Sequence, residues 1–403
     1  MKDKFEREIT YIRLSVTDLC NLRCIYCMPE NGVIKRRHED IMRIEEIEEI
    51  VRAASSLGIK KVRVTGGEPL VRRGITEICR RVSSVHGIEE VCLTTNGLLL
   101  PQFADELYAV GVRRINISLD SLDSDTYRVI TRGGDLKSAL RGIDAARKAG
   151  FAAIKINVVL MDGINDGELR SLADLSRIAG THVRFIERMP IGRGVETIKT
   201  SADAGEGCPS IRRIHSPRSE LEAVGSVDPE LESISSVKSE LEPIGFVDPE
   251  LEPISSFNSE LEVIGSVEPE LEPISSVKSE LEPLHSFNSE LESISSFKSE
   301  LEPIGFDGVA QLYTLPNAGG SGTVGFISPV SQHFCASCNR IRVTSDGKLK
   351  PCLHSAEEIN LRGLHGKALM DAISAAIWEK PRGHLLDSAT GSLTARNMNE
   401  IGG

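Results

Sequence analysis

The sequence is poor in aromatic residues and has no long apolar run. Aromatic side chains make up 4% of its 403 residues, and there is one tryptophan. No run approaches the roughly 18–20 apolar residues that a membrane-spanning helix needs, so no membrane partner is expected. The first residues, MKDKFEREITYIRL, lack the apolar core of a signal peptide. We therefore expect a cytoplasmic protein, long enough for two domains or for one barrel with an appendage.

Cysteine is present in an odd number, which does not suit a disulfide framework. Six of the nine cysteines form two close groups near the ends of the chain: Cys20, Cys24 and Cys27, and Cys335, Cys338 and Cys352. An odd count without a signal peptide favours free or metal-binding thiols over disulfides. The isolated Cys79 and Cys92 are interpreted as small buried apolar side chains.

Negative charge is concentrated in one segment. Residues 216–303 contain 21 Asp and Glu against 4 Lys and Arg, a net charge of −17 in a chain with a total of −12. The remaining residues therefore carry +5, which suits an anionic small molecule as ligand. Within the acidic segment the triplet ELE recurs every ten residues from 220 to 300. Its Ser, Glu and Pro leave few apolar residues to bury, so we interpret the array as a disordered insertion, an acidic docking or solubilising arm. An irregular stacked structure is the alternative.

Strand and helix patterns alternate before this array. Strand-like runs occupy residues 11–17, 61–66, 90–97, 114–121, 152–160 and 182–189, and helical patterns occupy 41–58, 74–86, 101–110, 135–149 and 166–179. The pattern over 41–58 is closed by Gly58, and three of the other four end at a glycine, at positions 87, 111 and 150. Six strands that alternate with helices predict a parallel sheet, either doubly wound or closed towards a barrel.

One face of nearly every predicted strand is polar. Arg13 alternates with Ile12 and Leu14, and Lys155 alternates with Ile154 and Ile156. The apolar face suits packing against helices, whereas the lumen of an ordinary barrel is filled with apolar side chains. Because unpaired buried charges are costly, the polar face indicates a partly open barrel with an anion in its lumen.

The first cysteine group has the spacing CxxxCxxC. Thiolates suit iron–sulfur clusters and zinc, but a closed structural zinc site takes four ligands. Three close thiols leave one iron of a cubane cluster open to chelate a substrate or cofactor. The group also follows the first strand directly, at the face where barrel enzymes keep their chemistry.

The second cysteine group has the spacing CxxC-x13-C. Spacing alone leaves a zinc ribbon open, with His354 or His333 as fourth ligand. However, the group again supplies only three thiols, and Arg340 and Arg342 follow on one face of a predicted strand. An arginine pair beside an open metal site favours binding of an anionic substrate.

These motifs resemble a known family. CNLRCIYC and the TGGEP of residues 65–69 are similar to motifs of the radical S-adenosylmethionine (SAM) enzymes. Residues 5–195 and 305–403 closely resemble the GTP 3′,8-cyclase family of molybdenum-cofactor biosynthesis, through RLSVTDLCNLRCIYCMP, KVRVTGGEPLVR, TTNG, NISLDSLD, RFIERMP, GTVGFISPVS, FCASCNRIRVTSDGKLKPCL and the final IGG. The resemblance implies a lyase that binds two [4Fe-4S] clusters and SAM.

The resemblance also implies residue roles. The first cluster is expected on Cys20, Cys24 and Cys27, and the second on Cys335, Cys338 and Cys352. SAM contacts are expected from Tyr26, Gly67, Ser118 and Met189. GTP contacts are expected from Arg13, Arg63, Thr94, Lys155, Arg340 and Arg342, of which Arg13, Lys155, Arg340 and Arg342 are candidate catalytic residues. Lys61 and Arg184 are further candidates, and the terminal Gly402 and Gly403 are expected to reach the active site.

The fold that follows is α/β, a partial (incomplete) TIM-type (β/α)6 barrel with a C-terminal cluster-binding domain and a disordered repeat insertion. Its predicted parts are the barrel at residues 5–195, the divergent segment and repeat at 196–304, and the cluster domain at 305–403. The implied function is conversion of GTP to its 3′,8-cyclo nucleotide with an electron donor, with a homodimer as an open option and no nucleic acid or membrane partner. A zinc-ribbon binding protein, or a family member inactivated by the repeat, are the alternatives.

Overall fold

The computed structural model describes residues 1–192, 294–316, 322–384, 386 and 392–402. These residues belong to one compact unit, Met1–Cys208 with Leu284–Gly403. The predicted disorder of the repeat, for residues 193–293, lies outside the described part of the chain, as does Gly403. No helix in the described ranges is long and apolar enough to cross a membrane.

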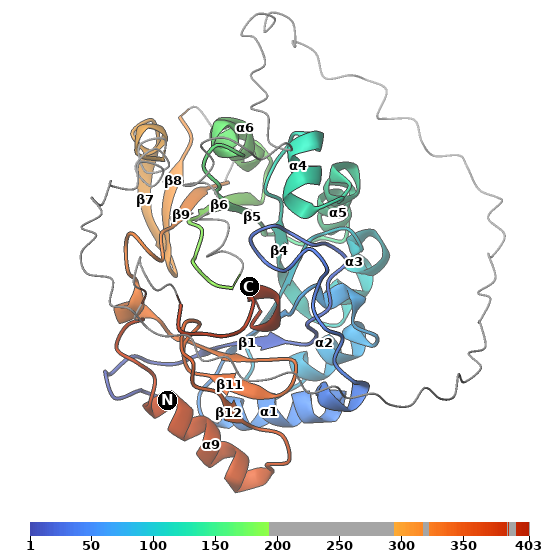
Figure 1. Cartoon of the computed structure of the whole chain (residues 1–403), viewed down its shortest axis with the longest axis vertical. Helices are drawn as coiled ribbons and strands as arrows, with labels where there is room; N and C mark the ends of the chain where they lie inside the picture. The colour runs from blue at the N-terminus through green and yellow to red at the C-terminus, as the bar shows by residue number, and fades with distance from the viewer. Residues whose placement is uncertain (193–293, 317–321, 385, 387–391, 403) are drawn as a thin grey trace, which may run out of the picture. The chain divides into compact units, whose positions relative to one another are not determined.

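Six parallel strands of the N-terminal half form the centre of one sheet (Figure 1). They are β1 (Tyr11–Ser15), β2 (Lys61–Thr65), β3 (Glu90–Thr95), β4 (Val112–Ser118), β5 (Ile154–Val159) and β6 (Thr181–Ile186). The connecting helices are α1 (Ile44–Ser56), α2 (Ile75–Ser83), α3 (Leu100–Ala109), α4 (Ser124–Thr131), α5 (Leu136–Lys148) and α6 (Leu169–Asp174), with short 3-10 turns η1 (His38–Asp40), η2 (Pro69–Val71), η3 (Asp166–Glu168) and η4 (Leu175–Arg177). The predicted strand-helix alternation is confirmed.

The C-terminal segment extends this sheet at both edges. It contains β7 (Glu302–Asp307), β8 (Ala310–Thr314), β9 (Val324–Ile327), β10 (Arg340–Val343), β11 (Lys348–Lys350), β12 (Ile359–Asn360), α9 (Gly366–Trp378) and the turns η6 (Cys335–Ser337) and η7 (Met398–Glu400). Strand β10 pairs in parallel with β1, and β9 pairs in parallel with β6. The strand order is β12-β11-β10-β1-β2-β3-β4-β5-β6-β9-β8-β7, so the ends do not meet and the barrel stays open.

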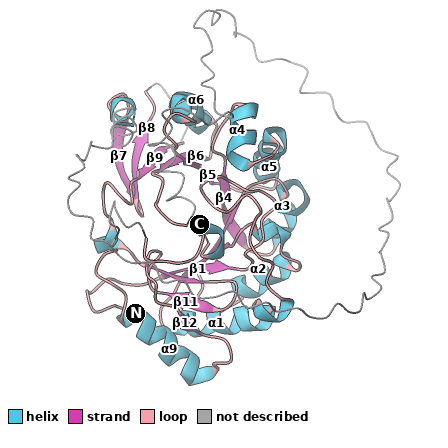
Figure 2. Ribbon diagram, in the orientation of Figure 1, coloured by secondary structure: helices cyan, strands magenta, loops and turns pink. Residues whose placement is uncertain are grey.

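Alternation along the strands decides which side chains meet the helices. Ile12, Leu14, Ile115 and Ile117 are fully buried in the apolar core, on the side that α1–α5 cover (Figure 2). Burying each such side chain is worth about 1.5–3 kcal/mol, so the alternation fixes the register of the sheet. The polar residues between them face the inside of the curve.

The helix boundaries follow local signals. Helix α5 begins after Asp135, whose carboxylate accepts hydrogen bonds from the amides of Lys137 and Ser138. The three predicted terminal glycines have positive φ, 86° at Gly87, 103° at Gly111 and 93° at Gly150. The helix predicted over 166–179 is instead split into η3, α6 and η4, and α4 was not predicted.

The last repeat unit is part of the fold, although it precedes the predicted boundary at residue 305, which stays a prediction. Residues 294–298 are helical, and β7 begins at Glu302. Phe297 is 5% exposed, and its ring packs at 6.2 Å from Phe185 and 6.3 Å from Phe326. These aromatic contacts stabilise residues that composition alone assigned to a disordered insertion. The other boundaries, at residues 5 and 195, stay predictions.

Candidate active site

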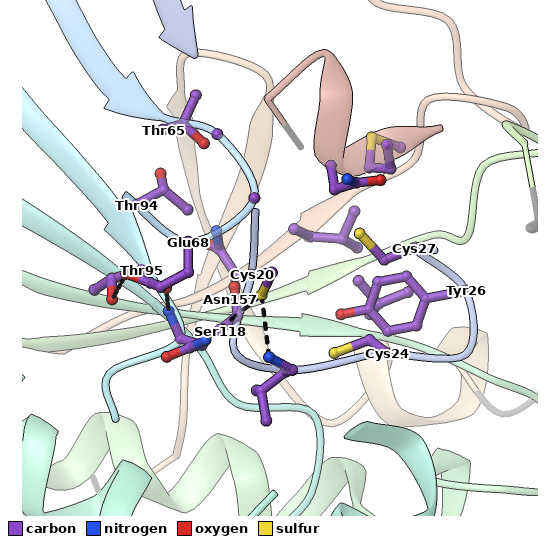
Figure 3. A pocket seen from close by; sticks show the side chains of 18 of the residues that line it. Cys20, Cys24, Tyr26, Cys27, Thr65, Glu68, Thr94, Thr95, Ser118 and Asn157 are labelled. Atoms are coloured by element: carbon purple, nitrogen blue, oxygen red, sulfur yellow. Dashed lines mark hydrogen bonds between the residues drawn. The ribbon is translucent and has the colours of Figure 1, made fainter. Parts of the chain in front are cut away.

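The first cavity lies at the carboxyl ends of the central strands. All seven residues predicted for the SAM cluster and for SAM line it: Cys20, Cys24, Tyr26, Cys27, Gly67, Ser118 and Met189. Figure 3 shows Cys24 and Cys27 on either side of Tyr26, on the loop that follows β1. The structure therefore brings together residues that are up to 169 positions apart, Cys20 and Met189.

The loop that carries the three thiols is held by its own backbone and by neighbouring elements. The amides of Cys27 and Met28 donate to the carbonyl of Cys24, at 2.9 and 3.2 Å. The Tyr26 hydroxyl donates to Asp120 Oδ2 at 2.8 Å, and Asp120 Oδ1 accepts from the Val159 amide. This arrangement positions the aromatic ring between two cysteines, and Asp120 is a contributor that sequence reasoning missed.

The first thiol group fits a metal cluster better than it fits free thiolates. Burial raises the pKa of Cys20 to about 11 and of Cys27 to about 12. Metal binding requires deprotonated thiols, so a bound cation would have to offset this effect of burial. Three soft sulfur donors in one cavity suit iron.

The TGGEP turn packs against this loop. A Cβ on Gly66 would lie 2.3 Å from the Thr17 carbonyl oxygen, and one on Gly67 would lie 2.3 Å from that of Leu19. The two glycines thus let the turn approach the backbone that leads to Cys20, and both also line the first cavity. Glu68 accepts from the Thr95 hydroxyl and the Asn96 amide, each at 2.7 Å, and holds the turn on β3.

A second cavity adjoins the first. It is lined by the whole second thiol group (Cys335, Cys338 and Cys352) and by the predicted GTP contacts Arg13, Thr94, Arg340 and Arg342. The two cavities share the lining residues Thr94, Asn157, Ile186, Met189 and Met398. A ligand in one therefore lies beside a ligand in the other, with no strand between them.

The second cavity is electropositive. Burial and the neighbouring Arg342 hold the pKa of Arg13 well below its usual range, and the nearby Arg63 lowers it further. Arginines that repel one another in a buried space gain most from a multiply charged anion that bridges them. The lumen expected from the strand pattern therefore has the charge of an anion site.

Four predicted cations do not line either cavity. Arg63 donates to the Tyr11 hydroxyl and, at 3.3 Å, to Thr94 Oγ1, so it contacts a residue of the cavity wall without lining the cavity itself. Lys155 and Arg184 both bond to the Asp307 carboxylate of β7. Lys61 pairs with Glu90 at 2.5 Å at the start of the strands. Their roles towards GTP stay predictions.

The C-terminal residues enter the site. Met398 and Asn399 line the first cavity, and the Asn399 amide donates to the Asp18 carbonyl at 2.9 Å. Arg342 donates to the carbonyls of Ile401 and Gly402. Gly402 has φ of +71°, and a Cβ there would lie 2.5 Å from a methyl group of Thr65. Gly402 therefore contacts Arg342 and Thr65, which line the cavities, but lines neither cavity itself, and its role in the active site stays a prediction.

Sequence reasoning missed part of the lining. Asn157, Met398 and Asn399 contribute to the cavities, yet none belongs to a cysteine or glycine motif. The period of two along β5 offered a signal for Asn157, which lies on the same face as Lys155. No local pattern marks Met398 or Asn399, because only the docking of η7 brings them to the site.

The fold and the first thiol group define the class of protein. Residues 14–176 match the radical SAM superfamily, and residues 270–386 match the family described as Molybdenum Cofactor Synthesis C. The match to Molybdenum Cofactor Synthesis C begins inside the repeat, and the structure also has a helix and a strand at the end of the repeat, from residue 294. It follows that the chain uses SAM and an iron–sulfur cluster.

Curated relatives narrow this class. The chain is 40% identical to the GTP 3′,8-cyclase of Alkaliphilus metalliredigens and 38% identical to that of Pelotomaculum thermopropionicum, and each alignment covers both chains in full. Among solved structures, that of Streptococcus suis SuiB bound to S-adenosylmethionine is similar over 91% of this chain and 63% of that one, at 13% identity and a TM-score of 0.47. The chain belongs to the family of GTP 3′,8-cyclases.

Proposed function

We propose that this protein converts GTP to its 3′,8-cyclo nucleotide, with SAM and one [4Fe-4S] cluster in the first cavity and a second [4Fe-4S] cluster in the other. The observation that carries the proposal is the pair of adjoining cavities, each with three cysteines in its wall. Names of relatives that are alike over the full chain support the choice of GTP as substrate. The product is the first intermediate of molybdenum-cofactor biosynthesis.

The chain's own residues would bind SAM and GTP, orient them and shield them from water. Tyr26, Gly67, Ser118 and Met189 would hold SAM, and Arg13, Thr94, Arg340 and Arg342 would hold GTP. The bound SAM and cluster would supply a 5′-deoxyadenosyl radical that takes the 3′ hydrogen of the ribose. Thr94, Asn157 and Met189 belong to the walls of both cavities, so they would lie between or beside the two ligands.

The charges in the second cavity match this substrate. A triphosphate and a chelating purine together need several cations and one open metal position. Arg340 and Arg342 stand two residues apart on β10, directly after Cys338, so one ligand can reach both guanidinium groups and the cysteine site. GTP would also contact four further cations if it extended beyond the cavity wall: Lys155, Arg63, Lys61 and Arg184.

Further parts of the proposal concern location and partners. Reductive cleavage of SAM needs one electron, so an external electron donor is required. A cytoplasmic location suits a substrate such as GTP and oxygen-sensitive clusters. We propose neither nucleic acid nor membrane as partner, and a homodimer stays a prediction.

The test is anaerobic reconstitution with iron and sulfide, followed by incubation with SAM, a strong reductant and GTP. We expect about eight irons per chain, formation of 5′-deoxyadenosine, and a cyclo nucleotide from GTP. Zinc without iron would overturn the proposal in favour of a structural binding protein. Formation of 5′-deoxyadenosine without any GTP product would indicate a family member that has lost its second activity.

The described residues already bear on the zinc alternative. No three histidine, cysteine or carboxylate side chains within the described ranges gather around a point that could hold a single metal ion. His354, a proposed fourth zinc ligand, bonds to the Ser392 hydroxyl at 3.1 Å.

A further inference from the structure

Two buried cations hold the three segments that carry the second thiol group. Arg7 donates to the carbonyls of Cys335 at 2.8 Å, of Arg382 at 3.0 Å and of Pro381 at 2.6 Å. Lys380 donates to the carbonyl of Arg340 at 2.8 Å and to that of Pro351 at 2.7 Å. The two donors, Arg7 and Lys380, belong to none of the sequence motifs.

The bonds of Lys380 join the strand after Cys338 to the turn before Cys352. Arg340 stands two residues after Cys338 at the start of β10, and Pro351 directly precedes Cys352. One ammonium group that spans both carbonyls therefore fixes the distance between two of the three thiols.

The two cations differ in how their charge is balanced. Arg7 is paired with the Asp3 carboxylate at 2.6 Å. Lys380 is 2% exposed and lines the second cavity, and no ion pair joins it to a carboxylate in the described part of the chain. A buried ammonium without an anionic partner is costly, so a nearby anion is expected when the protein is complete.

The thiols beside Lys380 are the candidates for that anion. Cys335, Cys338 and Cys352 line the same cavity as Lys380 and Arg340. A cluster on three thiolates carries net negative charge and would lie between these cations. Lys350 offers the contrast, because it is fully buried and lies 3.4 Å from the carboxylate of Glu358, which Arg396 also contacts.

We propose that Lys380 is a positioning residue of the second thiol group, which fixes Cys338 against Cys352 and supplies the positive charge that balances a bound cluster. The role rests on the proposed function, in which this group holds a cluster. A positive charge beside a cluster favours its reduced state, so Lys380 raises the reduction potential of the second cluster.

The experiment compares three variants in a chain whose first thiol group is replaced by alanine, so that only the second cluster is observed. Lys380→Gln keeps a hydrogen-bond donor and removes the charge, whereas Lys380→Arg keeps both. Lys350→Gln is the matched control, since that buried charge is already paired. Iron content is measured first, and the cluster is then titrated with reductant under electron paramagnetic resonance.

We expect Lys380→Gln to shift the one-electron reduction equilibrium about tenfold towards the oxidised cluster, about 59 mV. Lys380→Arg keeps the positive charge, so its reduction potential should stay close to that of the unchanged chain. Lys350→Gln should lower thermal stability with little change in the reduction potential. An unchanged potential in Lys380→Gln, or equal shifts in both glutamine variants, would overturn the charge role. An unsubstituted chain that holds four irons rather than eight would show earlier that the second cluster itself is wrong, and the role of Lys380 would fall with it.

Discussion

Replacing Gly402 with alanine tests whether the C-terminal residues serve the second reaction rather than the fold. The added methyl meets two obstacles: φ of +71°, and the methyl group of Thr65 at 2.5 Å. The left-handed backbone alone costs about 1–2 kcal/mol, and leaving the site loses the bond from Arg342 to the Gly402 carbonyl. One to two kcal/mol corresponds to a loss of about 5–30-fold in the docked population.

The assay measures two products of the same anaerobic reaction. Formation of 5′-deoxyadenosine should stay near that of the unchanged chain, while the cyclo nucleotide falls about 5–30-fold or more. Gly363→Ala is the control for backbone strain, because φ there is +75° and nothing lies within 4 Å of the added Cβ. Unchanged cyclo nucleotide in Gly402→Ala would refute the reasoning, and equal loss of both products would place the tail in the SAM site.

A second variant separates strain from collision. Thr65→Ser removes the methyl group that the new Cβ would strike but leaves φ of residue 402 unchanged. The double variant Thr65→Ser, Gly402→Ala should therefore recover part of the cyclo nucleotide relative to Thr65→Ser alone. No recovery would mean that the backbone conformation, and not the contact with Thr65, holds the tail.

Four other outcomes follow from the site and the fold. Alanine at all three positions of the second thiol group should halve the iron, from about eight to about four per chain, and preserve SAM cleavage; loss of cleavage in a folded variant contradicts the division of labour. Arg340→Ala should weaken GTP binding by about 1.5–3 kcal/mol in calorimetry, and unchanged affinity would remove it from the substrate site. Deletion of residues 219–288 keeps the unit that contains Phe297, so iron loading and cyclo nucleotide should persist with lower solubility; a folded but inactive product would assign the array to the active site. Burial opposes ionisation of Asp307, but Lys155 and Arg184 lower its pKa to about 2. Its contribution to stability is therefore present above about pH 4 and lost as pH falls towards 2, and Asp307→Asn should flatten acid unfolding in that window.

The period of two along the strands predicted much of the barrel. It assigned Ile12 and Leu14 to the helix side and Arg13 to the inside, and the structure agrees. It could not show that Lys61 meets Glu90, because that pair depends on which strands are neighbours. Which strands are neighbours is a tertiary property. The sequence alone therefore cannot tell which polar residues of a strand face contact a ligand and which form internal ion pairs.

The end of the repeat shows a second limit. All the units have nearly the same composition, yet the unit that contains Phe297 packs against Phe185 and Phe326. Nothing in the residues of the unit distinguishes it from earlier ones. Its aromatic partners lie more than a hundred residues upstream and some thirty residues downstream, so context and not composition decides its structure.

The candidate site could be predicted where chemistry is concentrated in a motif. Cysteine spacing identified both thiol groups, and the turn at Gly67 followed from its glycines. Asp120 belongs to a quoted motif but received no role from it, and Lys380 carried no signal, because its partners are backbone carbonyls on distant segments.

The pairing of β10 with β1 has a consequence for synthesis on the ribosome. Tyr11 lies opposite Arg340, so about 330 residues must be made before the outer edge of β1 finds its partner. At about 5–20 residues per second, that edge stays open for roughly 16–65 s. An unpaired strand edge is a template for wrong pairing. Each additional repeat unit between the two strands lengthens this interval. We therefore expect the nascent chain to be most prone to aggregation before β10 has been synthesised.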